Sequence, residues 1–458
     1  MTGPILSHGQ PARVALVTLG CAKNLVDSEI MAGLMAKGNF TTTSDPRDAD
    51  VALVNTCAFI GPSQKESIDR ILEMAALKRE GKLRGIVVAG CLAQRYQSDL
   101  LNEIPEVDAV VGTGQVDAIV RVMNRVLRSP SSRILEVGPP GTAVDLAAHR
   151  AVSTPRHVAY LRIADGCDFR CTFCIIPALR GDLRSRPLES VVEEARRLAD
   201  GGTRELLLIA QDSTSYGADL YGEARLPQLL RALAQIEGIE WIRVHYTHPK
   251  TWSEALIQVF EEEAKVCKYV DIPLQHVTDS MLRRMRREVR RADMERLIET
   301  LRSRIPGVAI RTHFIVGFPG ETEEDFTELL RYVREAQLDH VGCFAYSQED
   351  GTPAGRMKEQ LPERVKLSRR QALMAAQKKV AASVWGRWVG RTVSVRIDGP
   401  VPGRPGVGVG RVEQQGYEVD GVTYVRAADG ASAPATGERV RARIVRARHY
   451  DLDGEVAA

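Results

Sequence analysis

The chain has 458 residues, 44% of them hydrophobic and 26% charged, with a formal net charge of +3, which suits two to four globular domains. No apolar run reaches the roughly 18 residues of a membrane span, and the start MTGPILSHGQ lacks the basic flank and apolar core of a signal peptide. We therefore expect a cytoplasmic protein without a membrane partner, and so small a net charge does not by itself indicate nucleic-acid binding.

Residues 12–127 form the first predicted domain, in which short strands alternate with helices. A helical stretch from Ser63 to Lys78 separates two of the strands. The strands are Val-rich runs, typical of parallel strands buried on both faces: RVALVTLG (13–20), DVALVNT (50–56) and GIVVAG (85–90). The pattern predicts an open parallel α/β sheet.

A cysteine follows each of these three strands: Cys21, Cys57 and Cys91. The carboxyl ends of parallel strands meet at one edge of a sheet, so we expect the three thiols to gather there. Eight cysteines in a chain of this length indicate metal binding or catalysis in a reducing compartment rather than a disulfide scaffold. We infer an iron–sulfur cluster with one open iron; the alternative is three unrelated core cysteines, because free cysteine is often buried.

After a predicted linker (128–155), residues 156–383 carry six candidate strands separated by helical stretches. One helix lies in PLESVVEEARRLADGG, with Pro187 in its first turn and Gly201 at its end. Six βα units predict a partial TIM-like (β/α)6 barrel, whose active site is built by the loops that follow the strands. The candidate strands are 157–163, 205–210, 241–247, 267–272, 308–317 and 340–346.

The loop after the first of these strands contains a C-x-x-x-C-x-x-C run formed by Cys167, Cys171 and Cys174. Three thiols this close in sequence cannot all join disulfides without strain. Zinc usually takes four protein ligands at a structural site, and no fourth Cys or His lies nearby. An iron–sulfur cluster also favours four thiolates, so three leave one iron open to bind a small molecule and pass it an electron. A zinc knuckle and buried apolar cysteines remain alternatives.

The segment 385–453 is rich in Val, Gly and Arg, and the alternation in TVSVRI and RVRARIVRA predicts a small antiparallel β-barrel. Its arginines could form a polyanion-binding face or a strand edge guarded by charge, and nearby acidic residues nearly offset them. These arginines are Arg439, Arg441, Arg443, Arg446 and Arg448. The position of this barrel after the central one suggests a role in substrate docking.

The C-x-x-x-C-x-x-C run resembles the signature of radical S-adenosylmethionine enzymes, and the whole chain resembles the radical methylthiotransferases. Members of that family have an N-terminal cluster domain, a radical-SAM barrel and a C-terminal TRAM module. The similarity is most specific for the RimO branch, and it rests on LGCAKNLVDSE (19–29), IAQDSTSYG (209–217), DIPLQH (271–276) and YSQEDGT (346–352). Ala22 departs from the usual Pro of that branch, but it stands at no ligand position.

The resemblance implies two 4Fe–4S clusters and S-adenosylmethionine as cofactors. Cys167, Cys171 and Cys174 would hold the cluster that binds the cofactor, and Cys21, Cys57 and Cys91 an auxiliary cluster that carries or donates sulfur. One cofactor molecule would supply the methyl group and another the radical that takes hydrogen from the β-carbon of an aspartate in protein twelve of the small ribosomal subunit. A sulfur donor and an electron donor are implied partners, and RNA contact through the TRAM module is a further one. The residues predicted on the cofactor side are Phe173, Asp212, Asp271, Gln275, Gly317 and Pro319, for which barrel packing and turns are the alternative.

Three classes of function remain open at this stage. They are a radical methylthiotransferase acting on a ribosomal protein or on N6-modified adenosine in tRNA, a two-cluster electron-transfer protein, and a zinc-stabilised RNA-binding protein. Glu349 and Asp350 stand in YSQEDGT, where the tRNA branch has an Arg-containing loop. Acidic groups at a barrel mouth would repel phosphates and attract a basic ribosomal protein, so we expect a ribosomal aspartate as the substrate.

Overall fold

The computed structural model describes residues 11–129, 132–140, 150–428 and 431–457, which form two compact units. The first unit contains the described residues up to Ser153, together with Ala164–Arg186 and Ser347–Gly355. The second contains Thr154–Ile163, Pro187–Tyr346 and the described chain from Arg356 onward. The stretch MTGPILSHGQ and part of the predicted linker lie outside the described residues.

The first unit is built on a parallel sheet with the strand order β2-β1-β3-β4-β5-β6. The three strands predicted from the sequence form β1, β3 and β4, which are neighbours in this sheet. The short strands β2, β5 and β6 extend the sheet on both sides, and β6 lies in the segment predicted as a linker. The bounds are β1 Ala12–Thr18, β2 Phe40–Thr43, β3 Val51–Thr56, β4 Gly85–Gly90, β5 Ala109–Val111 and β6 Ile134–Glu136.

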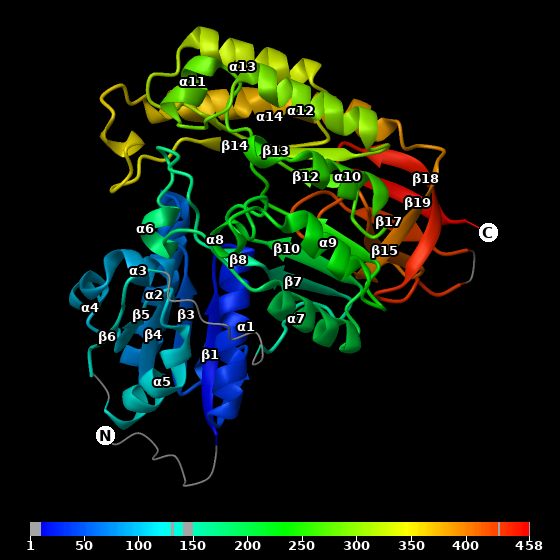
Figure 1. Cartoon of the computed structure of the whole chain (residues 1–458). Helices are drawn as coiled ribbons and strands as arrows, with labels where there is room; N and C mark the ends of the chain where they lie inside the picture. The colour runs from blue at the N-terminus through cyan, green and yellow to red at the C-terminus, as the bar shows by residue number, and fades with distance from the viewer. Residues whose placement is uncertain (1–10, 130–131, 141–149, 429–430, 458) are drawn as a thin grey trace. The chain divides into compact units, whose positions relative to one another are not determined.

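Helices cover both faces of this sheet (Figure 1). On one face α1 and α5 pack together, and on the other α2, α3 and α4 contribute Ile71, Leu92 and Leu100 to a cluster with Ala52 and Val54 of β3. Because both faces are covered, every residue of β3 and β4 is buried. The bounds are α1 Ala22–Lys37, α2 Gly61–Arg79, α3 Cys91–Tyr96, α4 Ser98–Glu103 and α5 Ile119–Arg128.

The second unit contains six parallel strands in two three-stranded sheets, β11-β10-β7 and β12-β13-β14. A bridge between Ile242 of β11 and Val266, just before β12, links the two sheets. The result is a partial parallel barrel in the order in which the strands occur along the chain, which confirms the predicted fold class. The bounds are β7 Val158–Arg162, β10 Glu205–Ile209, β11 Trp241–Val244, β12 Tyr269–Asp271, β13 Ala309–Val316 and β14 His340–Ala345.

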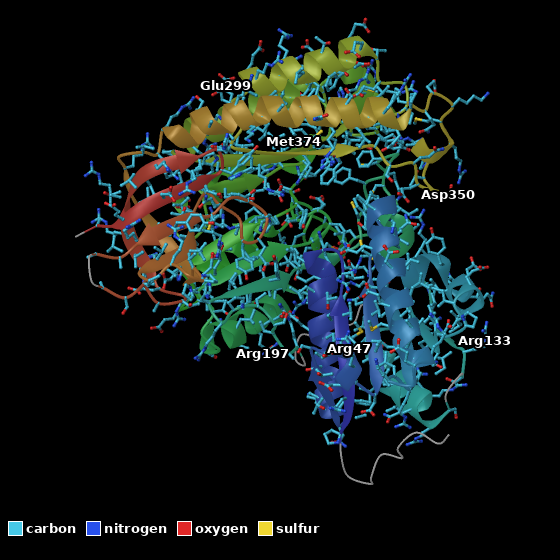
Figure 2. The ribbon with its side chains drawn as sticks, turned by 180° about the vertical axis from the view of Figure 1, so that it is seen from behind. Arg47, Arg133, Arg197, Glu299, Asp350 and Met374 are labelled. Carbon is cyan, nitrogen blue, oxygen red and sulfur yellow. The ribbon has the colours of Figure 1, made fainter. Side chains whose placement is uncertain are left out.

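Helices follow the barrel strands and cover their outer side (Figure 1). Thr322 and Asp325 form a capping box at the start of α13, and α14 packs on β14. Outward faces carry charged side chains, such as Arg197 on α7 and Glu299 on α12 (Figure 2). The bounds are α7 Leu188–Asp200, α8 Ala218–Tyr221, α9 Leu226–Ala234, α10 Glu254–Glu262, α11 Asp279–Arg284, α12 Arg291–Arg304, α13 Glu323–Glu335 and α14 Glu363–Gly386.

The C-terminal segment forms a closed barrel with the strand order β15-β16-β17-β19-β18, as the alternation predicts. All of its pairings are antiparallel except β17 with β19, which is parallel. Its core contains Val395, Ile397, Val425 and Ile444, and Trp385 of α14 packs into the same cluster. The bounds are β15 Thr392–Pro400, β16 Val407–Val412, β17 Thr423–Arg426, β18 Arg439–Arg448 and β19 Asp451–Val456.

Buried charges attach this barrel to the amino-terminal ends of the central strands. Glu205, the first residue of β10, accepts a hydrogen bond from Arg243 Nε at 2.9 Å and pairs with Arg411 Nη2 at 2.8 Å. All three side chains are buried. The second unit is therefore a partial barrel whose amino-terminal end is covered by the C-terminal barrel. None of the described helices is long and apolar enough to cross a membrane.

Candidate functional site

Three cysteines lie at the carboxyl edge of the sheet in the first unit. Cys21 is the N-cap of α1 after β1, Cys57 directly follows β3, and Cys91 directly follows β4 as the first residue of α3. Because β3 lies between β1 and β4, the three strand ends are neighbours. Cys57 and Cys91 are buried, and Cys21 is exposed. The structure brings these residues together, and their role as ligands stays a prediction.

The three thiol groups act on one another electrostatically. Burial raises the pKa of Cys91 to about 12, with smaller contributions from the charges of Cys21 and Cys57, while Arg180 opposes the rise. Burial also raises the pKa of Cys57, and the charge of Cys21 adds to this effect. Since the thiolate is the form that binds metal, loading this trio with metal would release protons.

Glycines before two of these cysteines let the strand ends approach closely. Gly20 has φ +91°, and a Cβ there would lie 2.7 Å from Cys57 Cβ. Gly90 has φ +90°, and a Cβ there would lie 2.3 Å from Asn55 Oδ1. Only glycine adopts such a backbone without strain and leaves this space open.

Asn24 in the first turn of α1 contacts the chain beside all three cysteines. It is fully buried, and its Nδ2 donates hydrogen bonds to the carbonyl oxygens of Leu19 and Thr56, both at 2.9 Å. Its Oδ1 lies 3.9 Å from Cys91 Sγ. One amide therefore ties the ends of β1 and β3 together and faces the cysteine that follows β4.

The second trio lies in the loop between β8 (Ala164–Asp165) and α6 (Ile176–Arg180), followed by β9 (Arg184–Ser185). Residues 166–175 contain turns and bends but no helix or strand. Cys167 N donates to Gly181 O at 3.1 Å, and Cys174 N donates to Cys171 O at 3.0 Å. Gly166, at φ +75°, leaves no room for a side chain, because a Cβ there would lie 1.9 Å from Asp182 O. Backbone hydrogen bonds, together with side-chain bonds from Arg170 to Cys167 O and from Leu183 N to Asp168, hold the loop in an irregular shape.

Arg180 connects the loop of the second trio to the helix beside the first. It ends α6, six residues after Cys174. Its Nη2 donates to Asn24 Oδ1 and to Asp27 Oδ2, both at 2.8 Å, and its Nη1 donates to Asp165 Oδ2 at 3.2 Å. Both trios therefore belong to one compact unit, and a buried guanidinium joins the elements that carry them.

The donor chemistry of each trio fits a 4Fe–4S cluster. All eight cysteines lie in described residues, and none of them forms a disulfide. In the described part of the chain, no three or more His, Cys, Asp or Glu side chains form a group that could hold a metal ion. A cubane cluster binds each thiolate at a different iron, so its ligands stand further apart than those of one ion. Three thiols would serve three irons and leave the fourth for a small molecule.

The six residues predicted on the cofactor side fall in both units. Phe173 lies half-buried in the turn between Cys171 and Cys174 in the first unit. The other five are in the second unit, at or just after the carboxyl ends of β10, β12 and β13: Asp212, Asp271, Gln275, Gly317 and Pro319. That edge is where a parallel barrel builds its active site. Cofactor binding stays a prediction for all six.

Two of these residues are buried carboxylates with bonds of their own. Asp212 accepts hydrogen bonds from the backbone and hydroxyl of Thr214, and burial raises the pKa of Asp212. Asp271 accepts from Arg311 Nη1 at 3.0 Å and from Tyr246 N at 3.1 Å. Burial alone would raise the pKa of Asp271, but the Arg311 charge holds it well below its usual range. These contacts give Asp271 a structural role as the ionised partner of Arg311.

Hydrogen bonds fix the loops that carry Gln275 and Gly317. Gln275 N donates to His313 O, and Gln275 O accepts from Ile315 N, both at 2.8 Å, so this loop pairs with β13. Gly317 N donates to the buried carboxylate of Glu321 at 2.5 Å. Gly317 has φ +71°, as the open GFPG loop requires. Glu321 is a further residue that anchors this loop.

The structure corrects the role expected for Glu349. We predicted that its charge would face a substrate, but only 3% of the residue is exposed. Its Oε1 accepts from Gly61 N at 2.7 Å at the start of α2, and its Oε2 accepts from Arg95 Nη1 at 2.8 Å. A carboxylate at the amino end of a helix completes hydrogen bonds that the helix cannot make itself. The neighbouring Asp350, in contrast, is exposed (Figure 2).

Three known families match parts of the chain. The radical SAM superfamily matches residues 161–333, the uncharacterized protein family UPF0004 matches residues 13–112, and the TRAM domain matches residues 389–457. The first range contains the C-x-x-x-C-x-x-C run, and the second contains the three cysteines at the strand ends.

Similar proteins cover almost the whole chain. A ribosomal protein uS12 methylthiotransferase RimO from Heliobacterium modesticaldum is 48% identical, with 97% of this chain and 95% of the relative covered. The chain belongs to the RimO methylthiotransferase family. Others bearing that name come from Symbiobacterium thermophilum (46% identical; 98% and 91% covered) and Geobacter sulfurreducens (45% identical; 97% and 98% covered). The predicted family is confirmed, and the protein is an enzyme of the radical SAM methylthiotransferase class.

Solved structures of other radical SAM enzymes share the fold. The radical S-adenosylmethionine methyltransferase TsrM from Kitasatospora setae gives a TM-score of 0.54 at 16% identity, with 75% of each chain covered. The cobalamin-dependent S-adenosylmethionine radical enzyme OxsB gives 0.53 at 12% identity, covering 80% of this chain and 56% of its own. At such identities the likeness concerns the fold alone.

The RimO-type motif LGCAKNLVDSE contributes more to the site than its cysteine. Asn24, Asp27 and Ser28 all lie on the buried side of α1, and Ser28 Oγ accepts hydrogen bonds from Thr18 and Asn55. Polar residues at positions i, i+3 and i+4 share one face of a helix, which was the available signal for a buried polar network. The sequence gives no such signal for a contact between this face and the α6 loop.

Proposed function

We propose that this chain transfers a methylthio group to the β-carbon of an aspartate in ribosomal protein uS12. The substrate comes from the names of its RimO relatives, and the chemistry comes from the cysteine trios. The observation that carries the proposal is that both trios belong to one compact unit, joined by Arg180. Two iron–sulfur clusters would thus be held on a single scaffold.

In this proposal Cys167, Cys171 and Cys174 hold one 4Fe–4S cluster and Cys21, Cys57 and Cys91 hold the other. When bound, the clusters and S-adenosylmethionine supply the radical, the sulfur and the methyl group, since no side-chain acid or base removes hydrogen from an unactivated carbon. The chain's own residues position these groups. Asn24 fixes the strand ends that carry the first trio, and the backbone around Gly166 fixes the loop of the second.

We propose that Phe173 and residues at the carboxyl edge of the partial barrel bind S-adenosylmethionine. The residues on that edge are Asp212, Asp271, Gln275, Gly317 and Pro319. Their place at the strand ends supports this assignment, as does the positive φ of Gly317 and of Gln275, which bends both loops sharply. The family matches support a division into a cluster domain (12–127), a linker (128–155), a radical SAM core (156–383) and a TRAM domain (385–453).

A ribosomal substrate suits the charge of the C-terminal barrel. All five arginines of β18 are exposed; Arg446 and Arg448 pair with Asp453 at 2.9 and 2.8 Å, and Arg439 lies 3.4 Å from Glu240. We infer that this exposed row of arginines contacts ribosomal RNA while the aspartate of uS12 enters the active site. The reaction also needs a sulfur donor and an electron donor, and a ribosomal substrate implies a cytoplasmic enzyme.

The test offers two substrates to the same reconstituted enzyme. The protein is loaded with iron and sulfide without oxygen, then incubated with S-adenosylmethionine, a reductant and either uS12 or tRNA carrying isopentenyladenosine. Mass spectrometry should find a methylthio group on an aspartate of uS12 and none on the tRNA. Modification of tRNA alone would overturn the substrate, and absence of cofactor cleavage would favour an electron-transfer protein.

A further inference from the structure

The buried guanidinium of Arg180 places a permanent positive charge beside the first trio. Its side chain is 2% exposed. It shares the Oδ1 atom of Asn24 with the Cys91 thiol, which lies 3.9 Å from that oxygen. Burial raises the pKa of the Cys57 and Cys91 thiols, and the charge of Arg180 lowers it. Because the group is buried, water and salt screen its field only weakly.

Carboxylates balance this charge on the side of α1 and of β8. Asp27 accepts from Arg180 Nη2 at 2.8 Å, Asp165 accepts from Nη1 at 3.2 Å, and Arg184 Nη2 lies 4.0 Å from Asp165. The carboxylates and the guanidiniums of this group come close to neutrality by themselves. Ionised thiols at Cys21, Cys57 and Cys91 would add negative charge beside this group.

We propose that Arg180 is a positioning residue that sets the reduction potential of the iron–sulfur cluster held by Cys21, Cys57 and Cys91. The inference rests on the proposed function, because it requires a cluster at this trio. A reduced cluster carries one more negative charge than the oxidised one, so a fixed cation nearby favours the reduced state and raises the potential. Arg180 also keeps Asn24 in place, because its Nη2 donates a hydrogen bond to Asn24 Oδ1.

The same inference predicts that removing the charge of Asp27 shifts the reduction potential in the opposite direction. It is buried and contributes a negative charge at Arg180 Nη2, the same nitrogen that bonds Asn24. An asparagine at this position can still accept the bond from Arg180 Nη2, but it removes the charge. Neutralising Asp27 should therefore raise the potential, whereas neutralising Arg180 should lower it. A residue that only supports the fold would not give opposite shifts.

The experiment measures this cluster without the other one. In a parent variant, Cys167, Cys171 and Cys174 are all changed to Ala, the protein is reconstituted without oxygen, and its iron and sulfide are counted. A redox titration followed by electron paramagnetic resonance then gives the midpoint potential. Arg180→Gln, Arg180→Lys and Asp27→Asn are compared in this parent. Arg121→Gln is the matched control, since Arg121 is an exposed arginine of the same unit that pairs with Glu136.

We expect a more negative potential for Arg180→Gln, a more positive one for Asp27→Asn, and values near the parent for Arg180→Lys and Arg121→Gln. Equal potentials in the parent and Arg180→Gln, or no rise in Asp27→Asn, would overturn the inference. If Arg180→Gln does not hold a cluster, the sign of the shift in Asp27→Asn decides alone. A parent that binds no iron would overturn the cluster assignment as well, so that failure is distinct from an unchanged potential.

Discussion

Glycines next to the cysteines decide, at the scale of single residues, how compact the two proposed cluster sites are. Gly90 combines φ +90° with ψ −152°, a region that is essentially closed to other residues. It directly precedes Cys91, as Gly20 precedes Cys21 and Gly166 precedes Cys167. All three have positive φ, so the direction of each following thiol depends on a backbone that only glycine adopts easily.

Changing Gly90 to Ala should therefore disturb both folding and cluster loading. Backbone strain of about 1–3 kcal/mol adds to the clash with Asn55 Oδ1 at 2.3 Å. Gly81→Ala is the matched control, because Gly81 also has positive φ but a Cβ there meets nothing within 4 Å. Iron content and the urea midpoint of both variants are the measurements. A Gly90→Ala protein that matches Gly81→Ala in both would show that the close approach is unimportant.

Loss of a cysteine should affect different steps of the reaction in the two trios. Cys171→Ala should abolish reductive cleavage of S-adenosylmethionine, because the cluster that binds the cofactor would lose one of its three protein ligands. Cys57→Ala should leave cleavage measurable and abolish the methylthiolated product. Chromatography of the cleaved cofactor and mass spectrometry of uS12 give the two readouts, and Cys343→Ala, outside both trios, should retain both. Product formed at the parent rate by Cys57→Ala would refute the auxiliary-cluster assignment.

The sequence reveals the six cysteines but not the residues that position them. The cysteines can be predicted because each stands at a strand end or within a short run, which are local signals. Arg180 bonds Asn24 across 156 residues of sequence. No periodicity or motif in the sequence reports a contact at that separation, so this part of the site required the structure.

At the scale of elements, the loop Ser347–Gly355 shows how a charge can be misread. Acidic residues after a barrel strand suggested an exposed specificity loop, yet Glu349 satisfies the first turn of α2 and pairs with Arg95. The helix start and the loop are 288 residues apart in sequence, so their contact could not be predicted. Glu349 therefore fixes the loop, and Asp350 alone presents its charge to solvent.

Neutralising Glu349 should cost stability, whereas neutralising Asp350 should not. Glu349→Gln leaves the Arg95 guanidinium buried without its anion, a loss of about 3–5 kcal/mol for a broken buried pair. Asp350→Asn should stay within about 0.5 kcal/mol, as for most surface substitutions. Urea unfolding of the metal-free protein measures both. A smaller loss for Glu349→Gln than for Asp350→Asn would contradict the observed burial.

Which strands could be predicted depends on their length and burial. The strands of the partial barrel are apolar runs bounded by polar loops, and all six are visible in the sequence. The short strands β2, β5 and β6 have three or four residues and were not predicted, whereas β12, with three, was predicted because it lies in the longer run 267–272. The parallel pairing of β17 with β19 was also hidden, because pairing direction depends on how the barrel closes.

At the scale of the whole second unit, buried ion pairs join the C-terminal barrel to the partial barrel. Arg411 of β16 bonds both Glu205 of β10 and Asp398 of β15, and His157 Nε2 lies 2.9 Å from Asp398 Oδ1. Removing one partner of such a group leaves a buried charge without compensation. The C-terminal barrel is thus a structural part of the second unit as well as the proposed docking module.

Acid should weaken this junction in a way that depends on Asp398. Burial alone would raise the pKa of Asp398, but hydrogen bonds and charge from Arg411 and His157 hold it below its ordinary 3.8. A carboxylate with a lowered pKa stabilises the fold at neutral pH, and this contribution is lost as the pH falls below about 4 and through the folded-state pKa. Asp398→Asn should therefore lower the free energy of unfolding by about 3 kcal/mol at pH 7, and the difference from the parent should shrink in acid.

Asp453→Asn, which breaks only surface pairs with Arg446 and Arg448, should cost at most about 1 kcal/mol. Urea unfolding at steps between pH 7 and pH 3 provides the test, and a constant difference over that range would show that the charge of Asp398 does not hold the junction.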